Sequence, residues 1–561
     1  MKLKEIIHKA LNMVSGEDNF VVERPNDENR GDFASSLALG IAKKSGENPR
    51  ELAEKWRQEL DKDVELMKVV DRVEVAGSGF LNFWIRDSYI ALGLEVIDQS
   101  LQTFYEPMKG KKVLVEYSSP NIAKRFSVGH LRSTIIGQAI FNFYKACGAK
   151  VTNDNHLGDW GTQFGMIIAA VEEEKLVVSE MTISDLEDLY VRFNRRLEDY
   201  PNLRDKAKEA FLRLENGDMD ARKIWKESVD ISMKEFDEIY SRLGVSFEHA
   251  YGESYFEESM SKIIEIAKNT GVAVDGENGA VIVKFEKDGK EYMSPAMLVK
   301  GDGTTTYFTR DLATIWQRIT EEELISDLYI YEVGGEQRLH MRQVFETAKK
   351  LWPKETKGRD FVHVAHGLLS LPEGKMSTRK GNTVKLEDLL GRASEEAKDK
   401  AEGKYNEKVS SQMGINAVKY NELKRSPGMD YVFLWEEALS MSGNSAPYIN
   451  YAYVRARKMV INIKELTVSK PLIFEGEEKE LARFLMRYLE GEVVQDAANN
   501  FGPQILSTYL FELAKRFNGF YDRNKVLGDT REKERVVLVS GVGKVLKHGM
   551  NLLGIEMVKE M

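Results

Sequence analysis

The chain has 561 residues, a net charge of −10 and 42% hydrophobic residues. This length and composition can bury several cores, so we expect three or four domains. No long uncharged apolar run occurs, which argues against a membrane span, and residues 1–14 predict an amphipathic helix rather than a signal peptide. The single cysteine, Cys147, excludes an internal disulfide and a cysteine-rich zinc site, so we expect a cytoplasmic protein without bound zinc.

Residues 1–105 predict an α+β unit. Helical patterns come first, and residues 73–85 then read as short strands. Nothing in this unit has a catalytic pattern, so a generic packing domain remains an open interpretation.

Residues 106–390 alternate apolar runs with helical patterns, which predicts a Rossmann-type parallel α/β sheet. The apolar run 113–115 leads into a polar loop that opens a helix, whose apolar residues recur at three- and four-residue spacing until Gly148. A second strand is expected near Val151. The highly charged stretch 172–242 has long helical periodicity, and we interpret it as a helical insertion with a solvated face.

The polar loop before the first predicted helix is a candidate phosphate site. Free amides at a helix N-terminus attract anions, and the small residues Ser127 and Gly129 let a nucleotide approach the backbone closely. His130, in the first helical turn, can donate a hydrogen bond to a phosphate oxygen whose charge grows during reaction. Taken alone, such a Gly-His pair is usually only a turn and a cap.

A second candidate phosphate site is the loop 374–381, with the sequence GKMSTRKG. Lys375 would be its phosphate ligand, and its glycines suit a mobile arm. Alone, the loop reads as a solvated basic stretch, because such stretches are common. The two loops together, in this order, favour a nucleotide site that activates a carboxylic acid with ATP.

These two loops resemble the HIGH and KMSKS motifs of class I aminoacyl-tRNA synthetases, and the surrounding sequence resembles arginyl-tRNA synthetases. The likeness continues in residues 30–44, 115–124, 153–165, 307–314, 334–345, 446–457 and 552–556. It therefore spans essentially the whole chain. It implies a ligase that activates L-arginine with ATP to arginyl-adenylate and pyrophosphate, then transfers arginine to the 3′-terminal adenosine of its tRNA.

The resemblance also implies a role for each part of the chain. Residues 1–105 would be an additional tRNA-binding domain, residues 106–390 the catalytic domain, and residues 391–561 an all-α anticodon-binding domain.

Aromatic and basic residues are interleaved in the C-terminal part, and such pairs can stack on unpaired bases while neutralising phosphates. The candidates for tRNA contact are Tyr448, Tyr451, Arg455 and Arg457. A bundle core explains most of the aromatic residues there equally well. Residues 451–561 hold 18 Lys and Arg against 15 Asp and Glu, a weak positive balance that permits binding to a phosphate backbone.

Carried over position by position, the resemblance implies a pocket for arginine. The guanidinium group is a planar, permanently charged fork that needs carboxylates placed to accept its hydrogen bonds, and Glu116 and Asp311 would supply them. The other implied arginine contacts are Ser119, Asn121, Tyr307 and Gln337. An ion pair with Arg310 or a helix cap remains open for Asp311, and a strand-edge charge for Glu116.

The implied catalytic residues are Lys124, His130 and Lys375, and the implied ATP contacts are Ser127, Gly129, His130, Met376, Ser377, Thr378 and Lys380. Two positions depart from the family pattern. Ser127 stands where histidine is common, and Thr378 stands where synthetases usually have a second lysine. Either Lys124 or Lys380 would compensate for Thr378, and the sequence leaves that choice open.

The resemblance further implies tRNA, L-arginine and ATP with Mg²⁺ as partners, no membrane, a monomer, and activation that requires bound tRNA. Two other functions remain open: a catalytically silent relative that binds tRNA, and an adenylating enzyme for another amino acid. The residues that argue against the first are all intact: Lys124, His130, Lys375, Glu116 and Asp311. Glu116 and Asp311 argue against the second, because a neutral substrate would leave two desolvated carboxylates without a partner.

Overall fold

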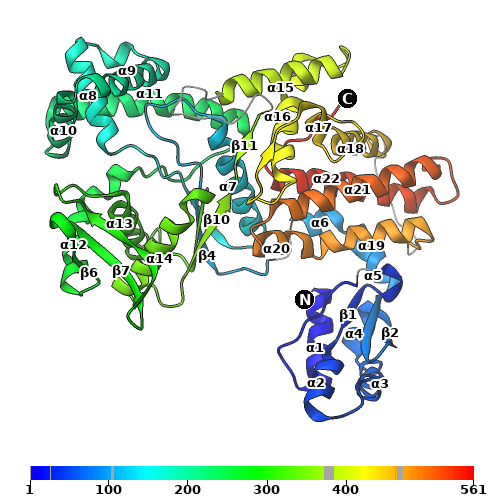
Figure 1. Ribbon diagram of the computed structural model, residues 1–561. Helices are drawn as coiled ribbons and strands as arrows, with labels where there is room; N and C mark the ends of the chain where they lie inside the picture. Colours follow the sequence, from blue (N-terminus) through cyan, green and yellow to red (C-terminus); the bar gives the residue numbers. More distant parts are fainter. Residues whose placement is uncertain (1, 26, 103–105, 372–384, 462, 464–471) are drawn as a thin grey trace. The chain divides into compact units, whose positions relative to one another are not determined.

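The structure is a computed structural model that describes residues 2–25, 27–102, 106–371, 385–461, 463 and 472–561 (Figure 1). The chain divides into two compact units. Unit 1 comprises Met1–Tyr105, Ile449–Gln495 and Tyr509–Gly549, and unit 2 comprises Glu106–Tyr448, Asp496–Thr508 and Met550–Met561. None of the helices in the described ranges is both long and apolar enough to cross a membrane.

Unit 2 is built on a four-stranded parallel sheet in the order β10-β9-β4-β5. Its strands are β4 (Lys112–Glu116), β5 (Lys150–Asp154), β9 (Leu328–Gly334) and β10 (Asp360–His366). The chain passes from β4 to β5 through α7 (Val128–Ala146), and from β9 to β10 through α14 (Arg338–Leu351). The strand order therefore reverses between β4 and β9, and such a switch point opens a crevice at the carboxyl ends of the strands. The predicted Rossmann-type sheet is confirmed.

Helix α7 packs closely against the end of β4. Most of its side chains are buried, as the apolar periodicity predicts. Gly137 lies against Tyr117, and a Cβ atom there would lie 2.2 Å from the Tyr117 side chain. Cys147 follows the last helical residue, and Gly148 turns the chain with a φ of 86°. The glycine at 137 therefore sets how near the first turns of α7 come to the crevice.

The charged stretch 172–242 is helical, as predicted. After α8 (Thr162–Glu174) it forms α9 (Ile183–Asp199), α10 (Asn202–Glu215) and α11 (Met219–Leu243), which gather at one end of unit 2 (Figure 1). Its charges form exposed ion pairs, such as Arg196 with Glu173 at 2.8 Å. One residue of α11 reaches the loop after β4, because the Ser232 hydroxyl accepts a hydrogen bond from Ala123 N at 2.9 Å.

A three-stranded antiparallel sheet lies outside the predicted parallel sheet. Its strands are β6 (Ala273–Asp275), β7 (Val281–Lys287) and β8 (Lys290–Val299). Asp288 and Gly289 join β7 to β8 with φ values of 52° and 73°, the left-handed conformation that a two-residue hairpin turn needs.

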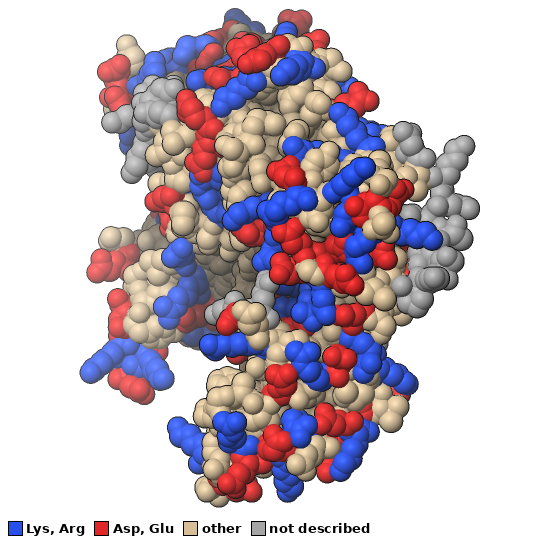
Figure 2. Space-filling view, turned by 90° about the vertical axis from the view of Figure 1, so that its right-hand side faces the viewer, with Lys and Arg blue, Asp and Glu red and all other residues tan. Residues whose placement is uncertain are grey.

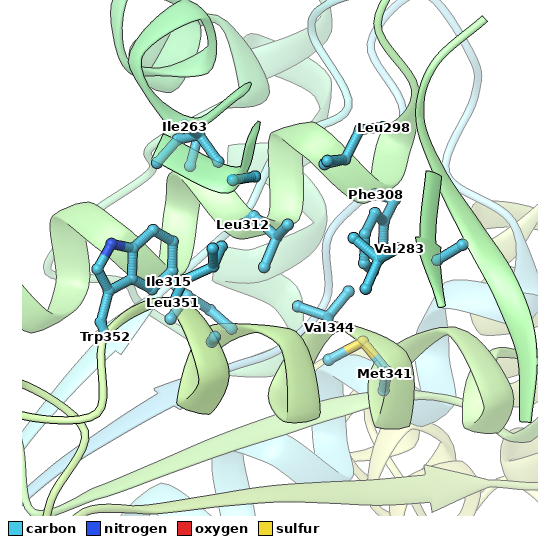
Figure 3. Packing of buried hydrophobic residues seen from close by; sticks show 14 of the residues in the cluster. Ile263, Val283, Leu298, Phe308, Leu312, Ile315, Met341, Val344, Leu351 and Trp352 are labelled. Atoms are coloured by element: carbon cyan, nitrogen blue, oxygen red, sulfur yellow. The ribbon is translucent and has the colours of Figure 1, made fainter. Parts of the chain in front are cut away.

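This sheet shares one core with α12 (Glu257–Asn269), α13 (Tyr307–Thr320) and α14. Figure 3 shows Leu312 and Ile315 of α13 directed toward Val344 and Leu351 of α14. These four side chains are at most 6% exposed. The packing fixes the spacing of two helices whose first turns border the crevice.

Hydrogen bonds hold the C-terminal tail of the chain against α7 and α16 (Glu407–Leu423) of unit 2. Three side chains of α7 and α16 donate to tail carbonyls at alternate residues: Asn142 to Leu552, Lys419 to Gly554, and Asn416 to Glu556. Leu553, Ile555 and Met557 of the tail are buried. The other elements of this region are α15 (Leu386–Lys400), α17 (Trp435–Ala438), β11 (Leu369–Ser370) and β12 (Tyr431–Val432).

Unit 1 combines an antiparallel sheet with helices, as predicted. Strands β1 (Phe33–Ser35), β2 (Val70–Ala76) and β3 (Phe80–Ile85) pair in the order β1-β3-β2. The N-terminal helices are α1 (Leu3–Ser15), α2 (Leu37–Ser45), α3 (Pro49–Leu60), α4 (Val64–Val69), α5 (Asp87–Glu95) and α6 (Ile97–Gln102). The C-terminal helices, part of which belong to unit 1, are α18 (Ala446–Val460), α19 (Glu477–Leu489), α20 (Glu492–Asn499), α21 (Pro503–Arg523) and α22 (Glu532–Leu552).

Candidate active site

A cavity of about 450 Å³ opens at the carboxyl ends of β4 and β9. Three carboxylate residues line it, Glu116, Glu253 and Asp311, so we call it the carboxylate cavity. The other residues that the resemblance implies for arginine binding also line it: Ser119, Asn121, Tyr307 and Gln337. All six implied arginine contacts are thus brought to one cavity, although they come from three separate stretches of the sequence.

A second cavity, of about 570 Å³, lies at the N-terminus of α7 and is lined by Ser127, Gly129 and His130. We call it the α7 cavity. Ser119, Asn121 and Gln337 line both cavities, so the two adjoin. The arrangement offers space for two ligands that touch each other.

The loop after β4 is strained where the cavities meet. Ser118 and Ser119 have φ values of 74° and 47°, which non-glycine residues rarely adopt. Asn155 Oδ1 holds the loop by accepting a hydrogen bond from Ser119 N at 3.1 Å. The Ser119 hydroxyl is buried and has no hydrogen-bond partner among the described residues. A buried polar atom of this kind normally has a partner, so the hydroxyl is free to bind a ligand.

Glu116 is paired behind the carboxylate cavity. It is 6% exposed and ends β4, an interior strand of the sheet, so it is not a strand-edge charge. Arg318 donates from Nη1 to Glu116 Oε2 and from Nη2 to Asp154 Oδ2, the latter at 2.6 Å. Burial alone would lower the pKa of Arg318, but the charge of Glu116, followed by Tyr331 and Asp154, raises it.

Asp311 has a different partner from the one considered in the sequence. Its Oδ2 contacts His340 Nε2 of α14, whereas Arg310 pairs with Glu253 Oε2 at 3.1 Å. Burial lowers the pKa of His340, but its hydrogen bond to Asp311 and the charge of Asp311 together raise it above 6.5. Asp311 therefore lines the cavity with one oxygen already held by an imidazole.

Glu253 is a cavity residue that the sequence did not reveal. It begins the 3-10 turn η3 (Glu253–Phe256), and its side chain is 12% exposed. Burial raises its pKa to about 7, against the lowering effect of Arg310. A single glutamate in a loop carries no periodic signal, and its partner Arg310 lies 57 positions later, so only the folded chain shows the pair.

His130 is held as a neutral imidazole at the α7 cavity. Burial lowers its pKa to about 4, and the charges of Lys124 and His366 act in the same direction. Its Nδ1 accepts a hydrogen bond from Ser127 N at 3.1 Å. The proton of the neutral ring is therefore on Nε2, which can donate a hydrogen bond to a ligand.

Lys124 does not line the α7 cavity. Its ammonium lies over the ring of Tyr190 in α9, 5.3 Å from the ring centroid. Burial lowers its pKa, and the charge of Glu187 acts in the opposite direction. The next residue, Arg125, donates to Glu187 and to Ser184 Oγ, so both basic residues of this loop face the insertion.

The second predicted phosphate loop lies outside the described residues, and this includes Lys375, Met376, Ser377, Thr378 and Lys380. The chain that follows is anchored beside the α7 cavity, because Lys385 forms an antiparallel bridge with Ser127 and Leu386 N donates to Phe126 O at 3.0 Å. Lys385 and Leu386 therefore lie beside the start of α7.

The residues implied for tRNA contact lie on α18. The guanidinium of Arg455 lies between the rings of Tyr451 and Tyr521, 4.5 and 4.6 Å from their centroids, and pairs with Asp522 at 3.3 Å. Tyr448 and Arg457 belong to the same helix. Tyr453, Tyr509 and Phe517 are buried, so the core interpretation is correct for these aromatics.

Charge is not segregated on the face that Figure 2 shows, where basic and acidic side chains are interspersed. Within the described ranges, no group of three or more His, Cys, Asp or Glu residues is placed to hold a metal ion.

Family models match nearly the whole chain. The model for the catalytic domain of class I (R) tRNA synthetases covers residues 95–435, that for the DALR anticodon binding domain residues 449–561, and that for the arginyl-tRNA synthetase N-terminal domain residues 1–85. The chain belongs to the arginyl-tRNA synthetase family. Two curated members of this family show how far the likeness extends. The arginine–tRNA ligase of Fusobacterium nucleatum is 35% identical over 95% of this chain and 94% of its own length. That of Shewanella halifaxensis is 36% identical over 97% and 96%.

Solved structures of the family share the fold. The arginyl-tRNA synthetase of Plasmodium falciparum superimposes with a TM-score of 0.81 at 25% identity, covering 100% of this chain and 98% of its own. That of Thermus thermophilus gives a TM-score of 0.82 at 22% identity, with coverages of 100% and 99%.

Proposed function

We propose that the carboxylate cavity and the α7 cavity together form the site where this chain activates arginine. The chain is an enzyme with the reaction of its family, an arginine–tRNA ligase. It joins L-arginine to ATP as arginyl-adenylate with release of pyrophosphate, then transfers arginine to the 3′-terminal adenosine of tRNA. The observation that carries the proposal is the convergence of all six implied arginine contacts on one cavity at the switch point of the sheet.

The carboxylate cavity takes the guanidinium group. Glu116 and Asp311 accept its hydrogen bonds, and Glu253 lines the same space with a third carboxylate. Each carboxylate is already paired, Glu116 and Glu253 with arginines behind the cavity and Asp311 with His340 in its wall, which lets three acidic groups share one space. Tyr307 completes the wall.

The junction of the cavities takes the other end of arginine. Ser119, Asn121 and Gln337 line both cavities and hold the amino and carboxylate groups of the substrate. The unpartnered Ser119 hydroxyl supports this role. The arginine carboxylate then faces the α7 cavity, where ATP binds.

The α7 cavity holds ATP for an in-line displacement. A carboxylate oxygen of arginine attacks the α-phosphorus, the bond between that phosphorus and the bridging oxygen breaks, and pyrophosphate leaves with the electron pair. His130 donates from Nε2 to a phosphate oxygen, and Gly129 admits the nucleotide to the start of α7. Positioning and charge stabilisation supply the rate, because phosphoryl chemistry needs little covalent help.

The remaining charge stabilisation comes from lysines. We assign it to Lys124 and Lys375, and the contacts of the second loop to Met376, Ser377, Thr378 and Lys380. Lys124 would have to leave the ring of Tyr190 to reach a phosphate, so Lys380 stays an equal candidate for replacing the lysine absent at Thr378. Mg²⁺ enters as part of the ATP substrate, bound to its phosphates, and we propose no protein-bound zinc.

The second step uses tRNA. We assign residues 1–105 and 391–561 to tRNA binding and residues 106–390, with the insertion 172–242, to catalysis. Tyr448, Tyr451, Arg455 and Arg457 contact the nucleic acid, and the 2′-hydroxyl of the terminal adenosine takes the arginyl group. We further propose a cytoplasmic monomer that activates arginine only with tRNA bound. A catalytically silent relative is disfavoured, because His130, Glu116 and Asp311 are present and placed in adjoining cavities.

Amino-acid-dependent pyrophosphate exchange tests this function. The assay is run with each of the twenty amino acids, with and without tRNA. Of the twenty amino acids, we expect exchange with arginine alone, because only the guanidinium group is a planar cation that can donate hydrogen bonds to the carboxylates of the cavity. We expect this exchange only when tRNA is present. Absence of arginine-dependent exchange in the presence of tRNA contradicts the proposal. Exchange with a neutral amino acid shows that the carboxylate cavity does not select the substrate.

A further inference from the structure

Arg318 lies directly behind the carboxylate cavity without lining it. Its side chain is fully buried, and its two terminal nitrogens bind two different carboxylates, those of Glu116 and Asp154. Its guanidinium also lies 5.3 Å from the ring centroid of Tyr331. Both Glu116 and Tyr331 line the cavity, so Arg318 touches two wall residues and reaches the ligand space only through them.

The two carboxylates occupy equivalent places in the sheet. Glu116 ends β4, Asp154 ends β5, and the two are register partners in adjacent parallel strands. Arg318 comes from the last turns of α13, the helix whose first turns carry Tyr307 and Asp311. One side chain therefore links the carboxyl ends of two strands to the helix that forms the opposite wall of the cavity.

The two carboxylates differ in whether they can still bind a ligand. Asp154 is committed to the fold, because Oδ2 binds Arg318 and Oδ1 accepts Tyr251 N at 3.1 Å. Glu116 binds Arg318 through Oε2 and faces the cavity. Arg318 thus fixes one oxygen of Glu116 while the carboxylate still lines the ligand space.

We propose that Arg318 is a positioning residue for arginine selection, which holds the Glu116 carboxylate aimed into the carboxylate cavity and thereby sets the affinity for the guanidinium group. The inference rests on the proposed function of that cavity. Burying a carboxylate is unfavourable unless an opposite charge compensates for its desolvation. Without Arg318, the Glu116 side chain would lose the partner that fixes Oε2 and would no longer be held in the position that a guanidinium ligand needs.

An arginine is required at this position, because its planar fork spans two carboxylates at once, whereas the single ammonium of lysine does not. The test therefore compares Arg318→Met and Arg318→Lys, each made in the natural chain and in a Glu116→Gln background. The control is Arg359→Met, which removes another arginine anchored near the end of α13, where its Nη1 donates to Ile319 O at 3.0 Å. For every variant, pyrophosphate exchange with tRNA gives kcat and the KM values for arginine and ATP.

We expect Arg318→Met to raise the KM for arginine about tenfold or more and to leave the KM for ATP within about twofold. Arg318→Lys should give a smaller rise in the same KM. In the Glu116→Gln background, Arg318→Met should change the KM for arginine by less than about twofold, because Arg318 acts through Glu116. Arg359→Met should leave all three parameters unchanged.

Two results overturn the inference. One is an equal rise of the KM for arginine in both backgrounds, and the other is a parallel rise of the two KM values, which indicates a general structural role. If Arg318→Met does not fold, the KM for arginine is compared instead between Arg318→Lys and the double variant Arg318→Met with Glu116→Gln, in which neither of the two charges remains. A failure of the proposed function gives a different result: Glu116→Gln and Asp311→Asn would leave the KM for arginine unchanged. If they raise it while Arg318→Met and Arg318→Lys do not, only the positioning role is wrong.

Discussion

Glu253 is a cavity residue whose ionisation state changes near neutral pH. Its carboxylate is buried beside Arg310, and burial raises its pKa to about 7. It lines the carboxylate cavity together with Glu116 and Asp311. A guanidinium ligand favours the ionised carboxylate, so the affinity for arginine should depend on pH in this range.

We expect the KM for arginine to fall as pH rises toward 7, by up to about tenfold per unit, and to level off above roughly pH 8. The sign follows from protonation: below its pKa Glu253 is neutral and accepts the guanidinium poorly. Pyrophosphate exchange with tRNA, measured from pH 6 to 8.5, gives the profile. Glu253→Gln should abolish this dependence of the KM for arginine on pH. If Glu253→Gln keeps the pH dependence of the natural chain, another group controls it.

The sequence predicts which residues line the site but not which residues pair with them. The family resemblance predicts one pocket that contains Glu116, Asp311 and Ser119, and all three line the carboxylate cavity. Their partners could not be predicted, since Arg318 lies 202 positions from Glu116 and His340 lies 29 positions from Asp311. Contacts of this kind depend on which faces of α13 and α14 meet the sheet, and periodicity alone does not define that register.

Helix α7 is the element that relates the two cavities. It begins at the α7 cavity and packs its buried face against the end of β4, where Gly137 lies against Tyr117. By contrast, Gly391 of α15 has no atom within 4 Å of the position a Cβ would take. The two helical glycines therefore form a matched pair, one tightly packed and one open.

We expect Gly137→Ala to destabilise the chain by about 2 to 3 kcal/mol, because the new methyl group overlaps the Tyr117 side chain. Gly391→Ala should instead stabilise it by up to about 1 kcal/mol, since alanine favours the helix and no atom opposes it. Thermal and urea unfolding measure both changes. Equal effects of the two substitutions would contradict the close packing of α7 on β4.

Most elements of unit 2 were predictable, and the antiparallel sheet shows where prediction failed. The strand before α7, the helix itself and β5 lie where periodicity placed them. The sequence analysis does not predict the hairpin β7-β8, although Asp288-Gly289 is a hairpin-turn signal. Charged residues flank this turn on both strands, so no apolar run adjoins it, and the sheet owes its stability to the core shared with α13 and α14.

At the scale of the whole molecule, the C-terminal tail returns to unit 2 and is held there by a buried lysine. Lys419 Nζ donates to Leu243 O at the end of α11 and to Gly554 O of the tail. Burial lowers the pKa of Lys419 to about 7. A neutral amine has two N–H donors, which matches the two carbonyls. No sequence pattern marks this contact, because it joins residues 135 and 176 positions apart.

The lysine makes stability depend on pH. Between pH 7 and 10.5 the unfolded chain binds a proton at Lys419 that the folded chain does not, so the free energy of unfolding should rise with pH in this window. From pH 7 to 9 the natural chain should gain roughly 2 to 3 kcal/mol relative to Lys419→Met. Urea unfolding at both pH values gives the difference, and a constant difference would show that the buried amine keeps its proton.

Arginine selection by the carboxylate cavity is tested most directly by comparing arginine with citrulline, its uncharged analogue, in Asp311→Asn. The measured quantity is the ratio of the citrulline inhibition constant to the KM for arginine in pyrophosphate exchange with tRNA. Asp360→Asn is the control, because it neutralises an exposed carboxylate at the opposite end of the sheet. We predict that Asp311→Asn lowers the ratio about tenfold or more with the KM for ATP unchanged, and that Asp360→Asn keeps it. An unaltered ratio in Asp311→Asn would contradict the account.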